Sequence, residues 1–255
     1  MATTWRWVCV LLLAMVSCAA WAQPLPRVLQ VQPSGAEVPE NLLRTSLTFD
    51  APVAEEVLSR LSLRHADGRI IDSPFLPQEL WSPDGRILTV LLHPGRVKTG
   101  LVAHETLGPI LVAGESVVLV LEGRPLRQWT VAPADGEGPV MAHWRVSPAP
   151  VGTRQPLVVA LDGPIDGRDA DFVAVIDSDE QRVEGRARLL DGERTWIFEP
   201  RRRWKPGPYR LLARETLEDA AGNRLGSRFE TSMLGAPIAA PASGLSFSVE
   251  ADASR

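Results

Sequence analysis

Short apolar segments alternate with turn residues along the whole chain. Residues 46–49 and 157–161 carry an apolar residue at nearly every second position, which is typical of half-buried β-strands. Asp67-Gly68 and Asp84-Gly85 separate further apolar segments and predict tight turns, because glycine adopts positive φ without steric cost. The 20 glycines and 22 prolines are numerous for a helical protein, since both residues interrupt helices. The pattern therefore predicts an all-β fold of short strands.

The strand and turn signals occur twice in the same order. We predict a first unit over residues 27–133, a linker of Pro, Gly and Asp over 134–142, and a second unit over 143–233. With about six or seven short strands each, the units are typical of immunoglobulin-like sandwiches. We therefore predict two tandem immunoglobulin-like β-sandwich domains, which contact each other because the linker is short.

The second unit carries a recognisable order of residues near its end. Pro206-Gly207 and Tyr209 open a strand, and Asp219-Ala220-Ala221-Gly222-Asn223 precedes the predicted last strand. This order resembles the bacterial Ig-like domains of S-layer proteins, the SbsA type. The first unit keeps Gly114 but has Glu122-Gly123-Arg124-Pro125 in place of the second motif. The resemblance implies a non-catalytic spacer or interaction module outside the cytoplasm, although a fold does not define a function.

Four residues of that region are predicted to have structural roles. Tyr209 is the only tyrosine, and its place after a Pro-Gly corner predicts that its hydroxyl bonds to nearby backbone. A plain core aromatic is the alternative. Asp219, Gly222 and Asn223 are predicted to define the geometry of a turn.

The first 22 residues have the composition of a signal peptide. Arg6 is their only charge, an apolar segment covers 7–16, and Ala20-Trp21-Ala22 predicts cleavage before Gln23. The alternative is a lipoprotein signal cleaved before Cys18, which then carries a lipid anchor. Either way the chain is predicted to be exported to the periplasm or the cell exterior. Cys9 lies in the same segment as Cys18, so a chain cleaved before Gln23 has no thiol.

Charge and motifs narrow the classes of function. The formal net charge is −4, and removing residues 1–22 takes away one arginine and no acid. This acidity argues against a general nucleic-acid binder, which normally has a basic surface. The sequence contains neither a nucleophile elbow, a phosphate-binding loop, nor a zinc-hydrolase motif. We therefore predict a non-enzymatic protein without a cofactor and without a transmembrane segment in the exported chain.

Two groups of residues are candidate metal ligands. Asp166, Asp169 and Asp171 are close in sequence and could supply oxygens to calcium, but their spacing does not match the known calcium loop and Arg168 interrupts them. A solvated acidic loop is the simpler interpretation. Met141 and His143 suggest an incomplete copper site. A periplasmic ligand- or metal-binding protein is accordingly the alternative to an interaction module.

Residues 93–111 form the longest irregular segment of the first unit. Long loops on rigid sandwiches often carry binding sites. We therefore predict that His93, Arg96 and Lys98, together with Trp81 on a neighbouring strand, bind an envelope protein or a surface polymer. A purely structural loop is the alternative. The basic segment 201–205 is a second candidate for docking an anionic polymer, with a solvated turn as its alternative.

The C-terminal residues 234–255 have the composition of a flexible tail, rich in Ala, Pro and Ser. The last strand of the second unit is predicted to end near Phe229. Within the tail, residues 245–249 alternate like a short strand, which predicts strand addition to a sheet edge of this chain or of a partner. Disorder is the alternative.

Overall fold

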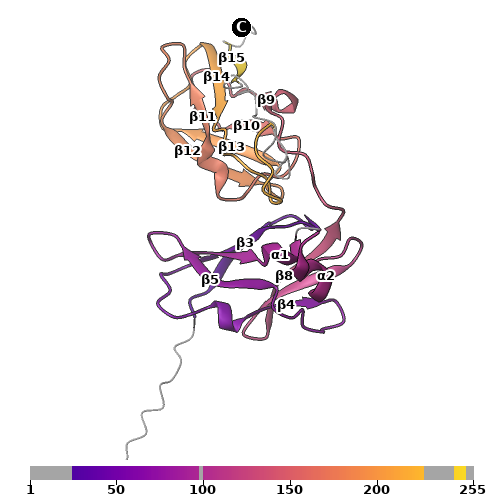
Figure 1. Ribbon diagram of the computed structural model, residues 1–255. Helices are drawn as coiled ribbons and strands as arrows, with labels where there is room; N and C mark the ends of the chain where they lie inside the picture. The colour runs from indigo at the N-terminus through magenta and orange to yellow at the C-terminus, as the bar shows by residue number, and fades with distance from the viewer. Residues whose placement is uncertain (1–24, 98–99, 227–243, 251–255) are drawn as a thin grey trace, which may run out of the picture.

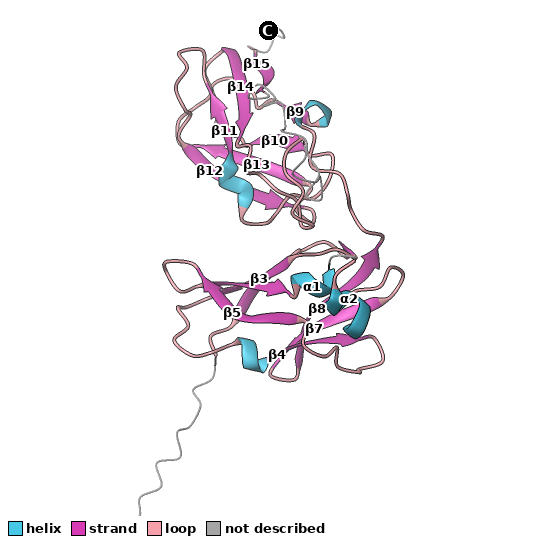
Figure 2. Cartoon of the chain, viewed as in Figure 1, coloured by secondary structure: helices cyan, strands magenta, loops and turns pink. Residues whose placement is uncertain are grey.

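The computed structural model describes residues 25–97, 100–226 and 244–250 of the chain (Figure 1). These residues form two β-sandwiches in tandem, joined by a linker, with only short helices between the strands (Figure 2). Within these described ranges, no helix combines the length and the apolar character needed to span a lipid bilayer.

The first sandwich has two sheets whose strand orders are β1-β3-β6-β5 and β2-β8-β7-β4. All neighbours are antiparallel except β2 and β8, which are parallel. This is the immunoglobulin arrangement, with strands A-B-E-D in one sheet and A′-G-F-C in the other. The strands are β1 (Val28–Gln32), β2 (Glu37–Pro39), β3 (Arg44–Phe49), β4 (Leu61–His65), β5 (Phe75–Trp81), β6 (Ile87–Leu92), β7 (Ser116–Leu121) and β8 (Arg124–Ala132). Its short helices are η1 (Leu58–Arg60), α1 (Pro94–Val97) and α2 (Val102–Leu107).

The second sandwich has the strand orders β12-β13-β10-β9 and β11-β14-β15, which correspond to D-E-B-A and C-F-G. Its strands are β9 (Arg145–Ser147), β10 (Leu157–Ala160), β11 (Val173–Ile176), β12 (Gly185–Leu190), β13 (Thr195–Pro200), β14 (Gly207–Ala213) and β15 (Gly244–Val249), and its 3₁₀ helices are η2 (Met141–His143) and η3 (Asp169–Phe172). The predicted fold class, all-β with two tandem immunoglobulin-like sandwiches, is confirmed.

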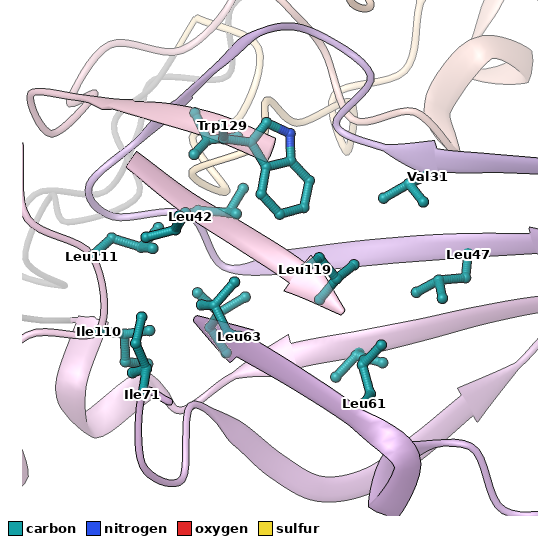
Figure 3. Close-up of a cluster of buried hydrophobic side chains, with 14 of the residues drawn as sticks. Val31, Leu42, Leu47, Leu61, Leu63, Ile71, Ile110, Leu111, Leu119 and Trp129 are labelled. Carbon is teal, nitrogen blue, oxygen red and sulfur yellow. The ribbon is translucent and has the colours of Figure 1, made fainter. Parts of the chain in front are cut away.

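Alternating apolar residues of the facing sheets form the core of the first sandwich (Figure 3). Leu47 of β3 and Leu119 of β7 are fully buried, and Trp129 of β8 lies between the sheets with its indole N–H donated to the Pro33 carbonyl at 3.0 Å. Burying each such side chain contributes about 1.5–3 kcal/mol. Ile110 and Leu111 join this core and hold the end of the long 93–111 segment against it.

Aromatic residues form much of the core of the second sandwich. Trp196 stacks on Phe198 with ring centroids 5.7 Å apart, and the series continues through Trp204 to Tyr209. Gly185 makes room for this packing, because a Cβ at that position would lie 2.4 Å from the Phe198 ring. Glycine is therefore required here by contact with a neighbour rather than by the conformation of its own backbone.

The last strand of the second sandwich differs from the sequence prediction. Residues 244–249 form β15, which pairs antiparallel with β14, so that Tyr209 lies opposite Phe247. The prediction that residues 245–249 form a strand that adds to a sheet edge of this chain is confirmed, whereas the flexible tail predicted over 234–255 is wrong for β15. Phe247 and Val249 are buried and complete the C-F-G sheet, whose core face would otherwise be exposed. The predicted strand ending near Phe229 lies outside the described residues.

Tyr209 lies at the start of β14 beside the Pro-Gly corner. Its hydroxyl donates to the Lys205 carbonyl at 3.1 Å and accepts from the Lys205 N–H at 3.3 Å. Burial raises the pKa of the Tyr209 hydroxyl, a shift that the hydrogen bond to Lys205 opposes and Asp177 adds to. The side chain thus bonds to backbone four residues upstream, which is the geometry of a tyrosine corner.

We expect Tyr209→Phe to lower the free energy of unfolding by about 1 kcal/mol, the usual net value of one hydrogen bond. The phenyl ring keeps its contacts with Trp204 and Phe247, so the loss reports on the hydroxyl alone. Thermal melting followed by circular dichroism measures it. A melting midpoint equal to that of the wild type would show that the corner does not stabilise the domain.

Candidate functional site

The joint between the two sandwiches is held by hydrogen bonds and ion pairs between them. In the second sandwich, the connections between strands B and C, D and E, and F and G lie at the same end, as immunoglobulin topology requires. Residues 164–168, 191–193 and 218–223 of these connections contact residues 32–46 of the first sandwich. These segments enclose a hollow of about 30 Å³, so the joint is closely packed.

Arg44, the first residue of β3, forms the central ion pairs of the joint. Its Nε contacts Asp166, and its Nη2 lies 2.6 Å from Oε2 of Glu218. Asp166 also accepts from Nε of Arg168 at 3.0 Å and from the backbone N–H of Arg168 at 2.9 Å. The side chains of Arg44, Asp166 and Glu218 are only 17%, 7% and 18% exposed. Each charge taken from water therefore faces an opposite charge.

The ionised states of this pair are favoured in spite of burial. Burial by itself raises the pKa of Asp166, but the charges of Arg44 and Arg168 and their hydrogen bonds outweigh it and hold this pKa below its ordinary value. Burial lowers the pKa of Arg44, but attraction to Asp166 and Glu218 outweighs it and holds this pKa above its ordinary value. The ion pair therefore persists at all pH values near neutrality.

Asp169 links the two loops that contact Arg44. Its carboxylate accepts from the backbone N–H of Glu218 at 2.9 Å, while the N–H of Asp166 donates to the Glu218 carbonyl at 2.8 Å. Burial raises the pKa of Asp169 to about 6, and the nearby Asp166 carboxylate adds to this shift. The hydrogen bond from Glu218 opposes it.

Residues 219–223 form a turn that docks on the first sandwich. Oδ1 of Asp219 accepts from the N–H groups of Ala221 and Asn223 at 2.8 and 2.9 Å, and Gly222 has φ +82°. Burial raises the pKa of Asp219 to about 6, against the effect of these hydrogen bonds. Ala220 packs into the core of the first sandwich, and its carbonyl accepts from the Leu43 N–H at 3.1 Å.

The linker is bonded to both sandwiches at Asp135. Nδ2 of Asn41 donates to the Asp135 carbonyl at 2.7 Å, and Oδ1 of Asn41 accepts from the Asp135 N–H at 2.9 Å. Nδ2 of Asn223 donates to the same carbonyl at 3.1 Å. One linker residue is thus fixed by an asparagine from each domain.

A third loop of the second sandwich approaches the first through Glu193. This side chain is 2% exposed, and its Oε2 accepts from the Ser34 N–H at 2.8 Å. Next to it, Gly192 has φ +66°, and a Cβ there would lie 2.8 Å from the Cα of Gly35. Glycine at 192 therefore permits the two backbones to touch.

The candidate metal ligands have other partners. Asp166 is paired with Arg44 and Arg168, Asp169 accepts a backbone N–H, and Asp171 is exposed on η3. Among residues 25–97, 100–226 and 244–250, no three or more His, Cys, Asp or Glu side chains are grouped so that they could hold a metal ion.

The copper candidates are separated as well. Met141 is buried in the core of the second sandwich, whereas the His143 side chain is 68% exposed and lies 3.9 Å from Asp162. The two side chains therefore lie in different environments.

The predicted binding residues around the 93–111 segment contact the protein itself. Arg96 is 6% exposed, and its guanidinium donates to five backbone carbonyls, those of Asp72, Ser73, Leu107, Gly108 and Pro109. Burial lowers the pKa of Arg96, while Asp72 opposes that shift. Arg96 thus fixes the segment from inside and is not available to a partner.

Trp81 and His93 also make internal contacts. The Trp81 indole N–H donates to Glu79 at 2.8 Å, and Nδ1 of His93 accepts from the Gly95 N–H at 3.2 Å. Lys98 lies outside the described residues. The exposed residues of the segment include Leu101, Val102 and Leu107, by 42%, 75% and 61%, beside the polar Glu105 and Thr106.

No protein-family model matches the chain, and no curated protein matches it in sequence. Solved structures that match it include an L,D-transpeptidase from Mycobacterium smegmatis, with 15% identity over 66% of this chain and a TM-score of 0.29; the chain spans 62% of that protein. The tandem Ig repeats of Dlar match with 15% identity, covering 76% of this chain and 92% of that one, at a TM-score of 0.21. Domains 5-6 of the S-layer protein SbsC match with 9% identity, covering 90% of this chain and 99% of that one, at a TM-score of 0.25. Similarities this weak support no conclusion about function.

The raised pKa of Asp169 predicts a pH-dependent stability. Below its ordinary pKa of 3.8 the carboxyl is protonated in both states, and stability falls as the pH rises towards about 6, because the unfolded chain ionises first. We expect Asp169→Asn, which keeps an acceptor for Glu218, to exceed the wild type by about 1–3 kcal/mol at pH 8 and to equal it near pH 3.5. Urea unfolding at both pH values measures this. A difference independent of pH would contradict it.

The internal bonds of Arg96 predict a structural role for this residue. We expect Arg96→Lys to lower the free energy of unfolding by about 1–3 kcal/mol, because an ammonium reaches fewer carbonyls than a guanidinium and leaves the others unpaired. Urea unfolding measures it. The matched control is Arg86→Lys, since Arg86 is exposed and bonds only the Asp50 carbonyl. If both variants are equally stable, the structural role of Arg96 is contradicted, and Arg96 is again a candidate for binding a partner.

Proposed function

We propose that this chain is an exported, non-catalytic Ig-like module of the bacterial cell envelope, of the S-layer (SbsA) type, and that it acts as a rigid spacer. The observation that supports this most directly is the joint, in which Arg44 of the first sandwich pairs with Asp166 and Glu218 of the second. A spacer must hold its two ends at a fixed distance and angle, and the ion pairs of the joint restrain the two sandwiches in one arrangement.

The chemistry of the joint favours one geometry over many. Domains in one chain usually move relative to each other unless their interface is large and apolar. Here the contacts are directional, because hydrogen bonds and ion pairs weaken steeply when their angles change. A rotation that separates Arg44 from Asp166 and Glu218 while the interface stays closed leaves a buried guanidinium without a partner, which costs about 3–5 kcal/mol. The Asn41 bonds to Asp135 restrain the linker at the same time.

The location outside the cytoplasm is supported by the sequence of residues 1–22. Cleavage before Gln23 gives a secreted protein, and cleavage before Cys18 gives a lipid-anchored one. Both outcomes place the two sandwiches in the envelope or beyond it, where a module without cysteines has no thiol to protect from oxidation.

A periplasmic metal or ligand carrier is the alternative function. The calcium version of this proposal depends on Asp166 and Asp169, and both carboxylates are engaged at the joint. Metal binding there would have to break the ion pair with Arg44. The spacer function agrees better with the roles these residues have.

Distance measurements between spin labels test the spacer. Chains beginning at Gln23 contain no cysteine, so Ala54→Cys and Ser178→Cys, at exposed positions of the first and second sandwich, place one label on each. We expect a single narrow distance distribution by double electron–electron resonance. Adding Arg44→Met removes the central ion pairs and is expected to broaden the distribution.

The matched control is Arg60→Met. Arg60 also pairs with two glutamates, Glu55 and Glu122, and its side chain is 21% exposed, but all three residues lie in the first sandwich. This control is expected to leave the distribution narrow. A broad distribution in the unmodified chain, or recovery of the full-length protein only from the cytoplasmic fraction of cells, would overturn the proposed function.

A further inference from the structure

A continuous groove begins at the end of the second sandwich that faces away from the joint and extends along β12 as far as Asp171 on η3. Two hollows of about 360 and 680 Å³ share the wall formed by Arg182, Val183 and Glu184. The first hollow lies between the loop after β11 and the loop before β14, and the second extends along β12. We call their union the basic groove. Each hollow has a volume within the range of ligand sites, about 300–1,000 Å³.

Cations without partners line this groove on both sides. Arg182 and Arg186 lie on one wall, and Arg202 and Lys205 on the other. All four are exposed, and none forms an ion pair with any residue in the described ranges. Arg203 lines the groove as well and donates to the Gly152 carbonyl at 2.7 Å.

Five acids also line the groove, and two of them form ion pairs. Glu184 lies 3.4 Å from Arg201, and Glu199 lies 3.0 Å from Arg188. Asp177 accepts the backbone N–H groups of Asp179 and Gln181 at 3.0 Å. Asp171 and Asp179 line the groove as well. The four cations without an ion pair, together with Arg203, outnumber these three aspartates, so the charge open to a ligand is positive on balance.

Apolar residues line the first hollow beside these cations. They are Val183, Pro206 and Pro208, together with the buried rings of Trp204 and Tyr209. A ligand that fits needs anionic groups at its edges and an apolar face between them, in a chain long enough to pass through both hollows. Sugar rings that carry acidic groups have this combination, because their C–H faces are apolar and their substituents lie at the rim.

We propose that the basic groove binds an anionic polysaccharide, with Arg182 and Arg202 gripping its carboxylate or phosphate groups from opposite walls. Arginine suits this role because its fork of donors matches both anions. This proposal rests on the proposed envelope function, and it names the class of polymer that the spacer would bind through its second sandwich. The joint is formed by residues 164–168, 191–193 and 218–223, none of which lines the groove, so bound polymer does not displace the contacts of the joint.

Binding of polygalacturonate, measured by isothermal titration calorimetry at about 0.1 M salt, where the Debye length is about 10 Å, tests the groove. We expect binding to polygalacturonate, none to neutral dextran, and an affinity that rises with oligogalacturonate length until both hollows are filled. The double variant Arg182→Glu, Arg202→Glu is expected to weaken binding about tenfold or more, since it removes two anion contacts and adds repulsion. Inorganic polyphosphate is an anionic chain without sugar rings. If it binds as tightly as polygalacturonate, the groove recognises charge alone and the proposal of a polysaccharide ligand is wrong.

The control variant Arg124→Glu, Arg145→Glu changes the net charge equally at exposed positions outside the groove. We expect it to bind within about twofold of the wild type, because distant surface charges are screened by salt. If both double variants weaken binding equally, the binding depends on the net charge of the protein and not on the groove, and the proposed polysaccharide site is wrong. That result would leave the spin-label distances unchanged, so failure of the groove and failure of the spacer are separate outcomes.

Discussion

The pairing of Arg44 with Asp166 and Glu218 is the interaction on which the two-domain arrangement depends. Charges removed from water are costly unless each finds a partner in good geometry. Arg44 belongs to the first sandwich and both carboxylates belong to the second, so the Arg44 guanidinium finds its ion-pair partners only across the joint. The remaining contacts of the joint, from Ala220 to Asp135, hold the loops where this pairing is possible.

The topology of the second sandwich separates two surfaces with different chemistry. Immunoglobulin strands place the B–C, D–E and F–G connections at one end and the C–D and E–F connections at the other. The first end is closed against the neighbouring domain by paired charges. At the second end, a groove is lined by cations such as Arg182 and Arg202, which form no ion pair with any described residue. One domain can thus be fixed at one end and bind at the other.

Two buried arginines show two ways to satisfy a guanidinium. Arg44 meets carboxylates, which makes its pairing dependent on charge and on the second domain. Arg96 meets carbonyl oxygens alone, five of them, all within the first sandwich. The first solution joins domains, and the second stabilises an irregular segment locally. Both residues look alike in the sequence, where each is an arginine next to apolar residues.

The sequence by itself determined the fold class, because alternation and turn chemistry act between neighbours in the chain. The strand residues 46–49 and the Pro206-Gly207 corner before Tyr209 belong to this class of signal. The turn at Asp219 was recognisable too, but its docking on Leu43 was not, since nothing local to residues 219–223 refers to the first domain. Likewise, the closeness in sequence of Asp166, Asp169 and Asp171 suggested a calcium site, and only the folded chain shows that Asp166 pairs with Arg44. Tertiary structure decided which charges meet, which strand closes the last sheet, and which side chains remain free, because these outcomes depend on distances between residues far apart in sequence.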